Sequence, residues 1–223
     1  MGTILASAIQ AKAAIDLFDE SADRFSNSDY LSWINEGQRQ ATKFKPDVNV
    51  TTSAVQLVAG TKQSLSAGEI ALINITRNMG TDGATPGNAI FFNPSMDQFA
   101  KRHPTWNTDT ESATVQLYFY NPKNPKIFYV YPKQPAASQG YVEIARSVLP
   151  TNVSAIGNAI NIGDEYEMEL YHYCMYKGNL EDAKHSQIAM QEAVSHYKQF
   201  LFLLERLDLI EKFAIEDIMK KGA

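Results

Sequence analysis

The fold of this chain is decided by one stretch, Val55-Gln56-Leu57-Val58-Ala59-Gly60-Thr61-Lys62-Gln63-Ser64-Leu65. Here the spacing of the hydrophobic residues changes from a helical period to a period of two residues. Short runs of apolar and polar residues on either side of a glycine are typical of paired strands, because glycine tolerates the positive φ of a tight turn. The stretch predicts a β-hairpin that turns at Gly60.

The period of two continues to about residue 148 and predicts a β-rich region. Further strands are expected at 71–75, 114–120, 126–131 and 141–148. Pro122 and Pro125 interrupt strand pairing between the middle two, so they predict a second hairpin. A glycine-rich loop is expected at 79–87 and a short helix from Asn93 to Arg102. The loop lacks the Gly-Lys-Ser/Thr ending of a phosphate-binding loop, so no phosphate site is predicted.

Before this region the period is helical. One face of a first helix collects residues at spacings of four and three, namely Ile4, Ala8, Ala11, Ile15 and Phe18. A second helix is predicted to begin near Ser28, an N-cap, and to end before Pro46. Its inward residues are Leu31, Ile34 and Ala41. Gly37 lies in its middle, where glycine costs about 1 kcal/mol relative to alanine, so we predict a close approach of another helix there.

After the β-rich region two more helices are predicted, at about 164–177 and 181–206. The first carries Tyr166, Leu170 and Tyr173 on one face. The opposite face carries Met168, Tyr171 and Met175, so this helix must be covered on both sides. The second helix has a broad apolar face, formed by Ala189, Met190, Ala193, Val194, Tyr197, Phe200, Leu201 and Leu204.

The tail at 207–221 continues as a possible helix with more apolar surface than one contact needs. A stripe on it is formed by Leu207, Ile210, Ala214 and Ile218. Outside that stripe lie Leu209, Phe213, Ile215 and Met219. We expect the tail to bind a partner and to contribute little to the subunit's own fold. The alternative is that it extends the preceding helix and packs on its own bundle.

The order of helices, strands and helices predicts an α+β protein of one or two folding units. Apolar runs reach four or five residues, far short of a bilayer span, and no basic segment precedes a long apolar core at the N-terminus. The lone cysteine, Cys174, cannot form an internal disulfide and fits a reducing compartment. We expect a soluble protein made in a cytosol, with no membrane partner.

The net charge of −5 is unevenly distributed. Residues 1–162 hold 13 acidic and 13 basic side chains, whereas residues 163–223 hold 12 acidic and 7 basic ones. A tight, sequence-reading nucleic-acid binder needs a basic stripe to neutralise phosphates, and none is visible. Any contact with DNA is expected to be weak and not sequence-specific.

No residues have the spacing of a catalytic or metal site. His185 and His196 would lie roughly 16 Å apart along a helix, too far for shared coordination. His172 and Cys174 are two residues apart and so point to different sides of a helix, which excludes them as joint ligands of a metal. A helix start, where the dipole favours negative charge, explains the carboxylates of Asp164, Glu165, Glu167 and Glu169. No Gly-x-Ser-x-Gly elbow occurs. We predict no catalysis, no metal and no cofactor.

The second predicted hairpin is rich in aromatic residues, namely Tyr118, Phe119, Tyr120, Phe128, Tyr129 and Tyr131. Such rings could form a base-stacking platform, as in proteins that bind single strands. Without accompanying lysines and arginines, packing or a protein interface is favoured. An alternative function rests on this hairpin: a small monomeric module that holds a carbohydrate or single-stranded nucleic acid. An unrecognised hydrolase is a third alternative.

The order and spacing of several segments indicate a family. They are Leu31-Ser32-Trp33-Ile34-Asn35-Glu36-Gly37-Gln38-Arg39, Lys45-Pro46-Asp47, the stretch 55–65, Arg77-Asn78-Met79-Gly80, Pro86-Gly87, Phe128-Tyr129-Val130-Tyr131-Pro132 and Gly140-Tyr141-Val142-Glu143. Together they resemble the head-to-tail connector, or adaptor, proteins of short-tailed bacteriophages. The resemblance is densest between residues 30 and 145 and continues in layout from 163 to 206. These are scaffold motifs rather than catalytic ones.

The resemblance implies a virion structural protein and not an enzyme. Its fold would be a helical bundle with an inserted antiparallel β domain and a C-terminal helical arm. The bundle helices would occupy 1–48 and 151–206, the β domain 49–150, and the arm 207–223. The implied assembly is a homo-oligomeric ring, expected to be dodecameric, that docks on the portal protein and carries the tail or nozzle protein. DNA would pass through its channel at the head-to-tail junction of the virion, after assembly in the bacterial host cytoplasm.

Two groups of residues are candidates for these contacts. Tyr166, Tyr171 and Tyr173 are expected between neighbouring subunits, because a tyrosine ring buries well while its hydroxyl finds a polar partner. The arm that would grip the portal supplies Leu209, Ile210, Phe213, Ile215, Ile218 and Met219. A two-sided helix and an apolar tail both favour an obligate oligomer.

Overall fold

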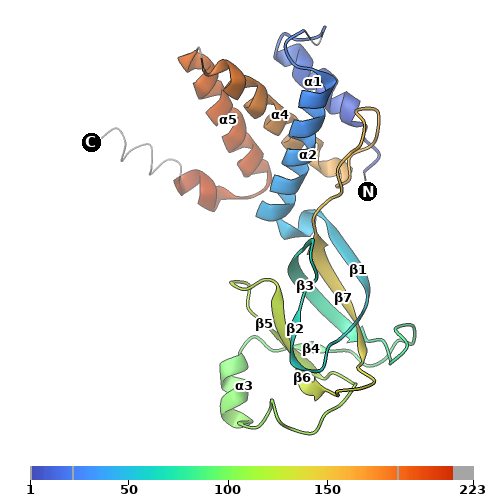
Figure 1. Ribbon diagram of the computed structural model, residues 1–223. Coiled ribbons are helices and arrows are strands. Elements are labelled where there is room, and N and C mark those ends of the chain that lie inside the picture. The colour runs from blue at the N-terminus through green and yellow to red at the C-terminus, as the bar shows by residue number, and fades with distance from the viewer. Residues whose placement is uncertain (1, 22, 185, 213–223) are drawn as a thin grey trace. The chain divides into compact units, whose positions relative to one another are not determined.

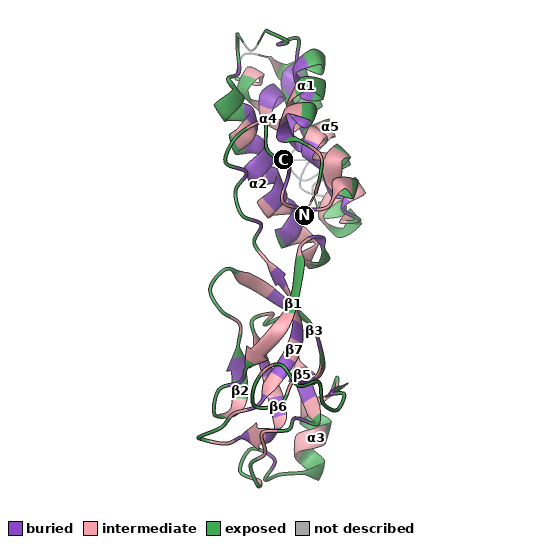
Figure 2. Ribbon diagram, turned by 90° about the vertical axis from the view of Figure 1, so that its right-hand side faces the viewer, coloured by how far each residue is buried: buried purple, intermediate pink, exposed green. Residues whose placement is uncertain are grey.

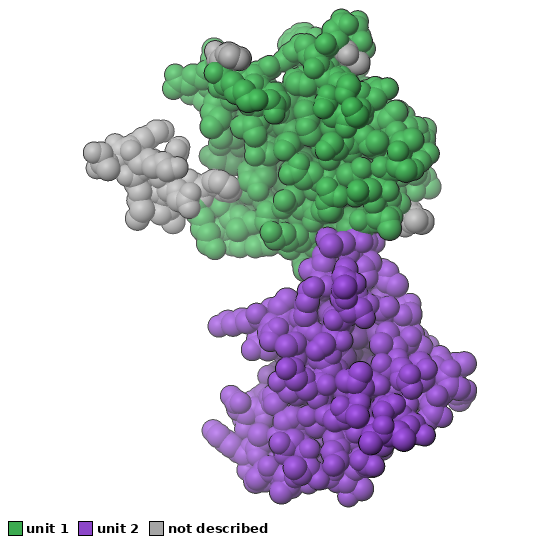
Figure 3. Space-filling model, in the orientation of Figure 1, with its two compact units in different colours: residues 1–48, 150–223 green, residues 49–149 purple. Residues whose placement is uncertain are grey.

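A computed structural model describes residues 2–21, 23–184 and 186–212 and divides the chain into two compact units. The helical unit comprises Met1–Val48 and Pro150–Ala223, and the β unit comprises Asn49–Leu149 (Figures 1 and 3). Helices and strands are both major components, so the protein is of the mixed α+β class. This confirms the fold class predicted from the sequence.

The helical unit is built around α4, which packs against three other helices. Its elements are α1 (Ala6–Asp16), α2 (Asn27–Phe44), η1 (Pro46–Val48), η2 (Asp164–Tyr166), α4 (Glu167–Asp182) and α5 (Gln187–Leu203). The buried residues, purple in Figure 2, form one core in this unit. Its largest fully buried side chains include Tyr30, Ile34, Leu170 and Phe200.

α1 is apolar on two faces, and only one of them lies in the core. The buried face consists of Ala6, Ile9, Ala13, Ala14 and Leu17. The face identified from the sequence is mostly exposed: Ile15 is 55% exposed and Phe18 92%. Ala8 and Ala11 are exposed as well, and only Ile4 packs against the core.

The N-cap of α2 lies two residues before the predicted one. Ser26 caps it, because its hydroxyl accepts a hydrogen bond from the Asp29 amide (3.3 Å) while the Asp29 carboxylate accepts one from the Ser26 amide (2.8 Å). Ser28 lies within the first turn. The helix ends at Phe44, before Pro46 as predicted.

Gly37 allows α4 to approach α2 closely, as predicted. A Cβ at this position would lie 3.0 Å from Leu170 Cδ2 and 3.1 Å from Tyr173 Cδ1. Both neighbours are buried side chains of α4, so they have little room to move.

Gly37→Val is expected to destabilise the helical unit by about 2 kcal/mol, because its branched side chain would overpack this contact. The measurement is the free energy of unfolding in urea. Gly157→Val is the matched control, since no heavy atom lies within 4 Å of a Cβ built there. Equal stabilities of the two variants would contradict the assignment.

The C-terminal helices divide at a different place from the predicted one. α4 extends to Asp182, and α5 begins at Gln187, where the Ser186 hydroxyl accepts a hydrogen bond from the Ala189 amide at 3.2 Å. This cap explains the later start of α5. The broad apolar face of α5 is also only partly inward, since Met190 and Val194 are 47% and 42% exposed.

Among the described residues, the strands form two sheets, both in the β unit. One sheet has the order β1 (Val50–Gln56), β7 (Tyr141–Val148), β3 (Glu69–Asn78). The other has the order β2 (Gly60–Ser64), β6 (Ile127–Gln134), β5 (Leu117–Tyr120), β4 (Phe91–Phe92), and α3 (Met96–Arg102) lies between β4 and β5 in the chain. A second core lies in this unit.

The hairpin predicted at 55–65 is wrong. β1 pairs with β7 and β2 pairs with β6, so the two strands belong to different sheets. Gly60 does adopt a positive φ of 94°, but its turn leads from one sheet to the other. In place of a backbone pairing between β1 and β2, the Gln63 side chain bonds to the Val58 backbone. The Val58 amide donates to Gln63 Oε1 and Gln63 Nε2 donates to the Val58 carbonyl, both at 2.8 Å.

The second hairpin and the last strand are confirmed. β5 and β6 pair antiparallel, with Tyr118 opposite Val130, and β7 has the predicted bounds. The strand pairs of the β domain are antiparallel as predicted, except that the two-residue strand β4 pairs with β5 in parallel. The predicted short helix is α3, capped by Ser95 rather than Asn93.

The β unit begins and ends at one place. The Val148 amide donates to the Asn49 carbonyl, and Asn49 Nδ2 donates to the Val148 carbonyl, both at 3.0 Å. β1 and β7 then continue side by side as neighbouring strands. Adjacent ends allow a domain to be inserted in a helical fold without separating the halves of that fold.

Candidate interaction surfaces

The three candidate tyrosines lie in different surroundings on and beside α4. Tyr173 is 3% exposed and packs on Phe200, with ring centroids 5.1 Å apart, so its own subunit encloses it. Tyr166 and Tyr171 are half-buried and retain accessible surface. The Tyr171 hydroxyl donates to Asp16 Oδ2 at 2.6 Å. Burial and this bond raise the pKa of Tyr171 to about 12, which keeps the hydroxyl a donor.

The arm begins inside the described part of the chain, where residues 207–212 are helical. Leu209 and Ile210 are half-buried and pack against the core of the helical unit. They therefore take part in the subunit's own packing, contrary to the expectation that the tail contributes little to it. Leu207 is 54% exposed. The remaining candidates, Phe213, Ile215, Ile218 and Met219, lie outside the described residues.

Arg206 fixes the root of the arm to the end of α2. Its Nη1 donates to the Phe44 carbonyl at 2.5 Å, and its guanidinium carbon lies 5.8 Å from the centre of the Phe44 ring. Its Nε and Nη2 donate to the Asp208 carboxylate, both at 2.8 Å. Lys45 and Glu205 add an ion pair at 3.0 Å. Because Arg206 occupies an open carbonyl of the α2 C-terminus, the first residues of the arm are held against the end of α2.

A histidine pair that sequence reasoning missed joins α4 to α5. His172 Nδ1 and His196 Nδ1 are 2.9 Å apart, so one nitrogen donates and the other accepts. Burial and the nearby His196 lower the pKa of His172. Burial also lowers the pKa of His196, against the opposing effect of Glu192 and Asp16.

This pair predicts acid sensitivity of the helical unit. Both folded-state pKa values lie below 6.5, so below pH 6.5 the unfolded chain binds protons more readily than the folded one. Stability from the pair is complete above pH 6.5 and is lost as the pH falls through the lowered values. Melting temperatures between pH 7.5 and 5 should fall less in a variant carrying both His172→Gln and His196→Gln. An unchanged pH dependence would contradict this.

The groups weighed as chemistry in the sequence have structural surroundings. Cys174 is fully buried, and burial raises the pKa of its thiol. The Asp164 carboxylate accepts hydrogen bonds from Thr3 and Ile4, which lowers its pKa and ties down the N-terminal segment. Within the described ranges, no three or more His, Cys, Asp or Glu side chains are grouped so as to hold a metal ion.

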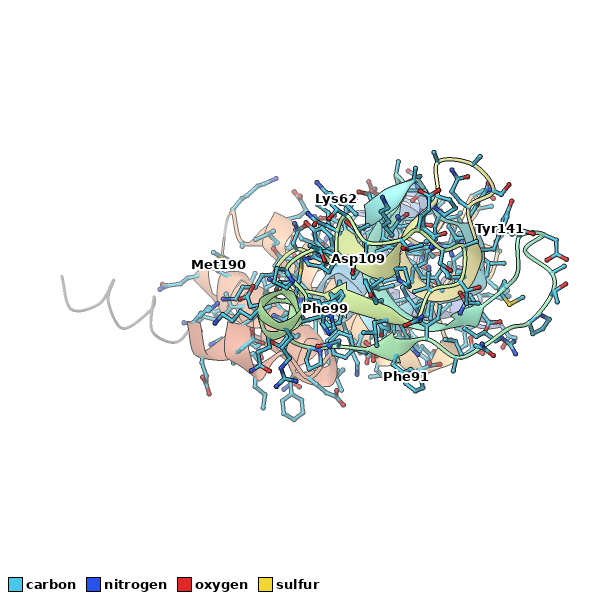
Figure 4. All side chains as sticks on the ribbon, turned by 90° about the horizontal axis from the view of Figure 1, so that it is seen from below. Lys62, Phe91, Phe99, Asp109, Tyr141 and Met190 are labelled. Atoms are coloured by element: carbon cyan, nitrogen blue, oxygen red, sulfur yellow. The ribbon has the colours of Figure 1, made fainter. Side chains whose placement is uncertain are left out.

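The aromatic hairpin of the β unit is packed on both sides. Tyr118 and Phe128 belong to the second core, and Phe119 is 2% exposed. On the other side Phe99 of α3, labelled in Figure 4, lies 5.1 Å from the rings of both Phe119 and Tyr131, and Trp106 lies 6.2 Å from Tyr129. An open groove of about 500 Å³ borders the hairpin. Base stacking needs free ring faces, so these contacts give no support to the binding-module alternative.

The helices of the described residues include none that is both long and apolar enough to cross a membrane. No curated protein matches the chain. The model of the SU10 adaptor protein family does match it, over residues 4–216, which include both units and the root of the arm. This chain therefore belongs to the SU10 adaptor protein family, a family of bacteriophage structural proteins that link head and tail components.

Proposed function

We propose that this protein is the ring-forming head-to-tail adaptor of a short-tailed bacteriophage. Copies of the chain, expected to number twelve, dock on the portal protein, carry the tail or nozzle protein, and leave a channel through which DNA passes. The family match over residues 4–216 carries the proposal, because it spans the bundle, the inserted β unit and the arm root together.

Two features of the helical unit support an assembly role. Large apolar side chains remain exposed on α1, just after its end and on α5, among them Ile15, Phe18, Ile188 and Phe202. Such surface is typical of a subunit whose partners are absent. The hydrogen bond from Arg206 to the Phe44 carbonyl holds the start of the arm against α2, which reduces the conformational entropy lost when the arm binds a groove.

The charge of the β unit is consistent with weak, non-specific contact with DNA. Residues 49–149 hold eight basic and six acidic side chains, whereas the rest of the chain holds twelve basic and nineteen acidic ones. So slight a positive excess predicts no tight DNA complex.

Electron microscopy of the purified protein mixed with portal rings tests the proposal. Rings of this protein coaxial with the portal are the expected result. A chain that remains monomeric and leaves the portal undecorated would show the proposed function to be wrong.

A further inference from the structure

Phe18 occupies a backbone conformation that favours glycine. α1 ends in a Schellman motif, in which the Phe18 amide donates to the Ile15 carbonyl at 3.1 Å and the Asp19 amide to the Ala14 carbonyl at 2.8 Å. The residue between these bonds adopts a φ of 54°, which is strained for any side chain with a Cβ. A strained, non-glycine residue at this position is an indication of function.

The Phe18 side chain is buried too little within its own subunit to offset this strain. The ring is 92% exposed, and Ile15, one turn earlier, is 55% exposed. Together with the exposed Ala8 and Ala11 they form an apolar ridge, which we call the α1 ridge. Both the conformation and the exposure are unfavourable in a free subunit, so the ridge is suited to burial against another molecule.

A second apolar strip lies on α5. Met190, Val194 and Phe202 are 47%, 42% and 57% exposed, and they recur with Lys198 at four-residue intervals. We call these four residues the α5 strip. A different side of α5 faces α1, since Ile188, Ala189 and Glu192 line a shallow groove of about 420 Å³ with Phe18 and Asp16.

The two surfaces are complementary in charge and separate in position. Asp19, Glu20 and Asp23 line a shallow depression beside Phe18 together with one cation, Arg24, so the end of the α1 ridge carries a net negative charge. The α5 strip contains one charge, that of Lys198, and it is positive. α1 and α5 each pack on α4, which lies between them in Figure 1. One copy can therefore use its α1 ridge and its α5 strip at the same time.

We propose that the α1 ridge of one copy packs on the α5 strip of the next copy. This contact joins unlike surfaces, so it repeats head to tail and closes into a ring when the rotation permits. The inference rests on the proposed function, since it supplies the lateral contact of the adaptor ring.

Phe18→Gly tests the ridge without disturbing the fold. Glycine accepts the positive φ, so the melting temperature of the subunit should be unchanged or raised, while the fraction of protein in rings should fall at least tenfold. Ser138→Gly is the matched control, because Ser138 has a φ of 58° in the β unit. Its rings should form normally. Normal rings from Phe18→Gly would overturn the inference.

Cross-linking identifies the partner surface. A mixture of Phe18→Cys and Val194→Cys chains, treated with a short thiol cross-linker, should give dimers, and a chain with both substitutions should give a ladder of larger species. The native Cys174 is buried and should not react. Dimers from Phe18→Cys alone would indicate a symmetric contact and overturn the inference. Rings that form without mixed cross-links would overturn this contact but leave the proposed function standing, whereas absence of rings from the unmodified chain mixed with portal rings would overturn both.

Discussion

Truncation after Lys212 is expected to abolish docking on the portal while the subunit keeps its melting temperature to within about 2 °C. The deletion removes Phe213, Ile215, Ile218 and Met219, and full burial of each such side chain contributes about 1.5–3 kcal/mol. Loss of even two of these anchors should weaken binding more than a hundredfold. Leu209, Ile210 and the hydrogen bond from Arg206 to the Phe44 carbonyl remain, so the packing of the helical unit is retained.

The measurements are retention on immobilised portal rings and thermal melting. A chain with Lys220→Ala and Lys221→Ala is the matched control, because it keeps the apolar residues of the arm and should still dock. Normal docking of the truncated chain would refute the role of the arm. A large loss of stability would instead favour the alternative that the tail packs on its own bundle.

α1 shows why periodicity located a helix without identifying its core face. Its buried side is largely alanine, and its exposed side carries Ile15 and Phe18, so hydrophobicity points to the wrong side. Which face of α1 lies in the core is decided by its close packing on α4. Small residues permit that close approach, whereas large ones would prevent it. Where one face was clearly more polar, as along β7, the predicted bounds were correct.

Strand partners were harder to predict than strands. Alternation predicts that a segment is a strand, but pairing is set by contacts distant in sequence, such as Val55 with Val142. The side-chain bonds of Gln63 that separate β1 from β2 leave no mark in the hydrophobic pattern.

For the candidate surfaces too, local features could be predicted from the sequence, whereas contacts between distant residues could not. Local pattern predicted a helix covered on both sides, and α4 packs against three other helices. His172 and His196 are 24 residues apart on different helices, so only the packing of α4 against α5 reveals them as a pair. Arg206 and Phe44 are 162 residues apart in the sequence, so their contact could not be predicted from the sequence either.

Asn35 connects α2 to the chain that returns from the β unit. Its Nδ2 donates to the Val153 carbonyl at 3.0 Å, and its Oδ1 accepts from the Val153 amide at 2.7 Å and from Gln38 Nε2 at 3.3 Å. Asn35 is 8% exposed and Val153 3%. Water therefore cannot easily replace the asparagine as partner of the Val153 backbone.

Asn35→Leu is expected to destabilise the helical unit by about 3–4 kcal/mol, because two buried backbone groups lose their partners at about 1–3 kcal/mol each. The melting temperature of this unit should fall by about 10 °C or more. Asn158→Leu is the matched control, since Asn158 is exposed and its side chain makes one hydrogen bond, to Ser154 Oγ at 2.9 Å. The β unit has its own core, so its unfolding should be the same in both variants. If the helical unit melted at the same temperature in both variants, the hydrogen bonds of Asn35 to the Val153 backbone would not be what holds the returning chain against α2.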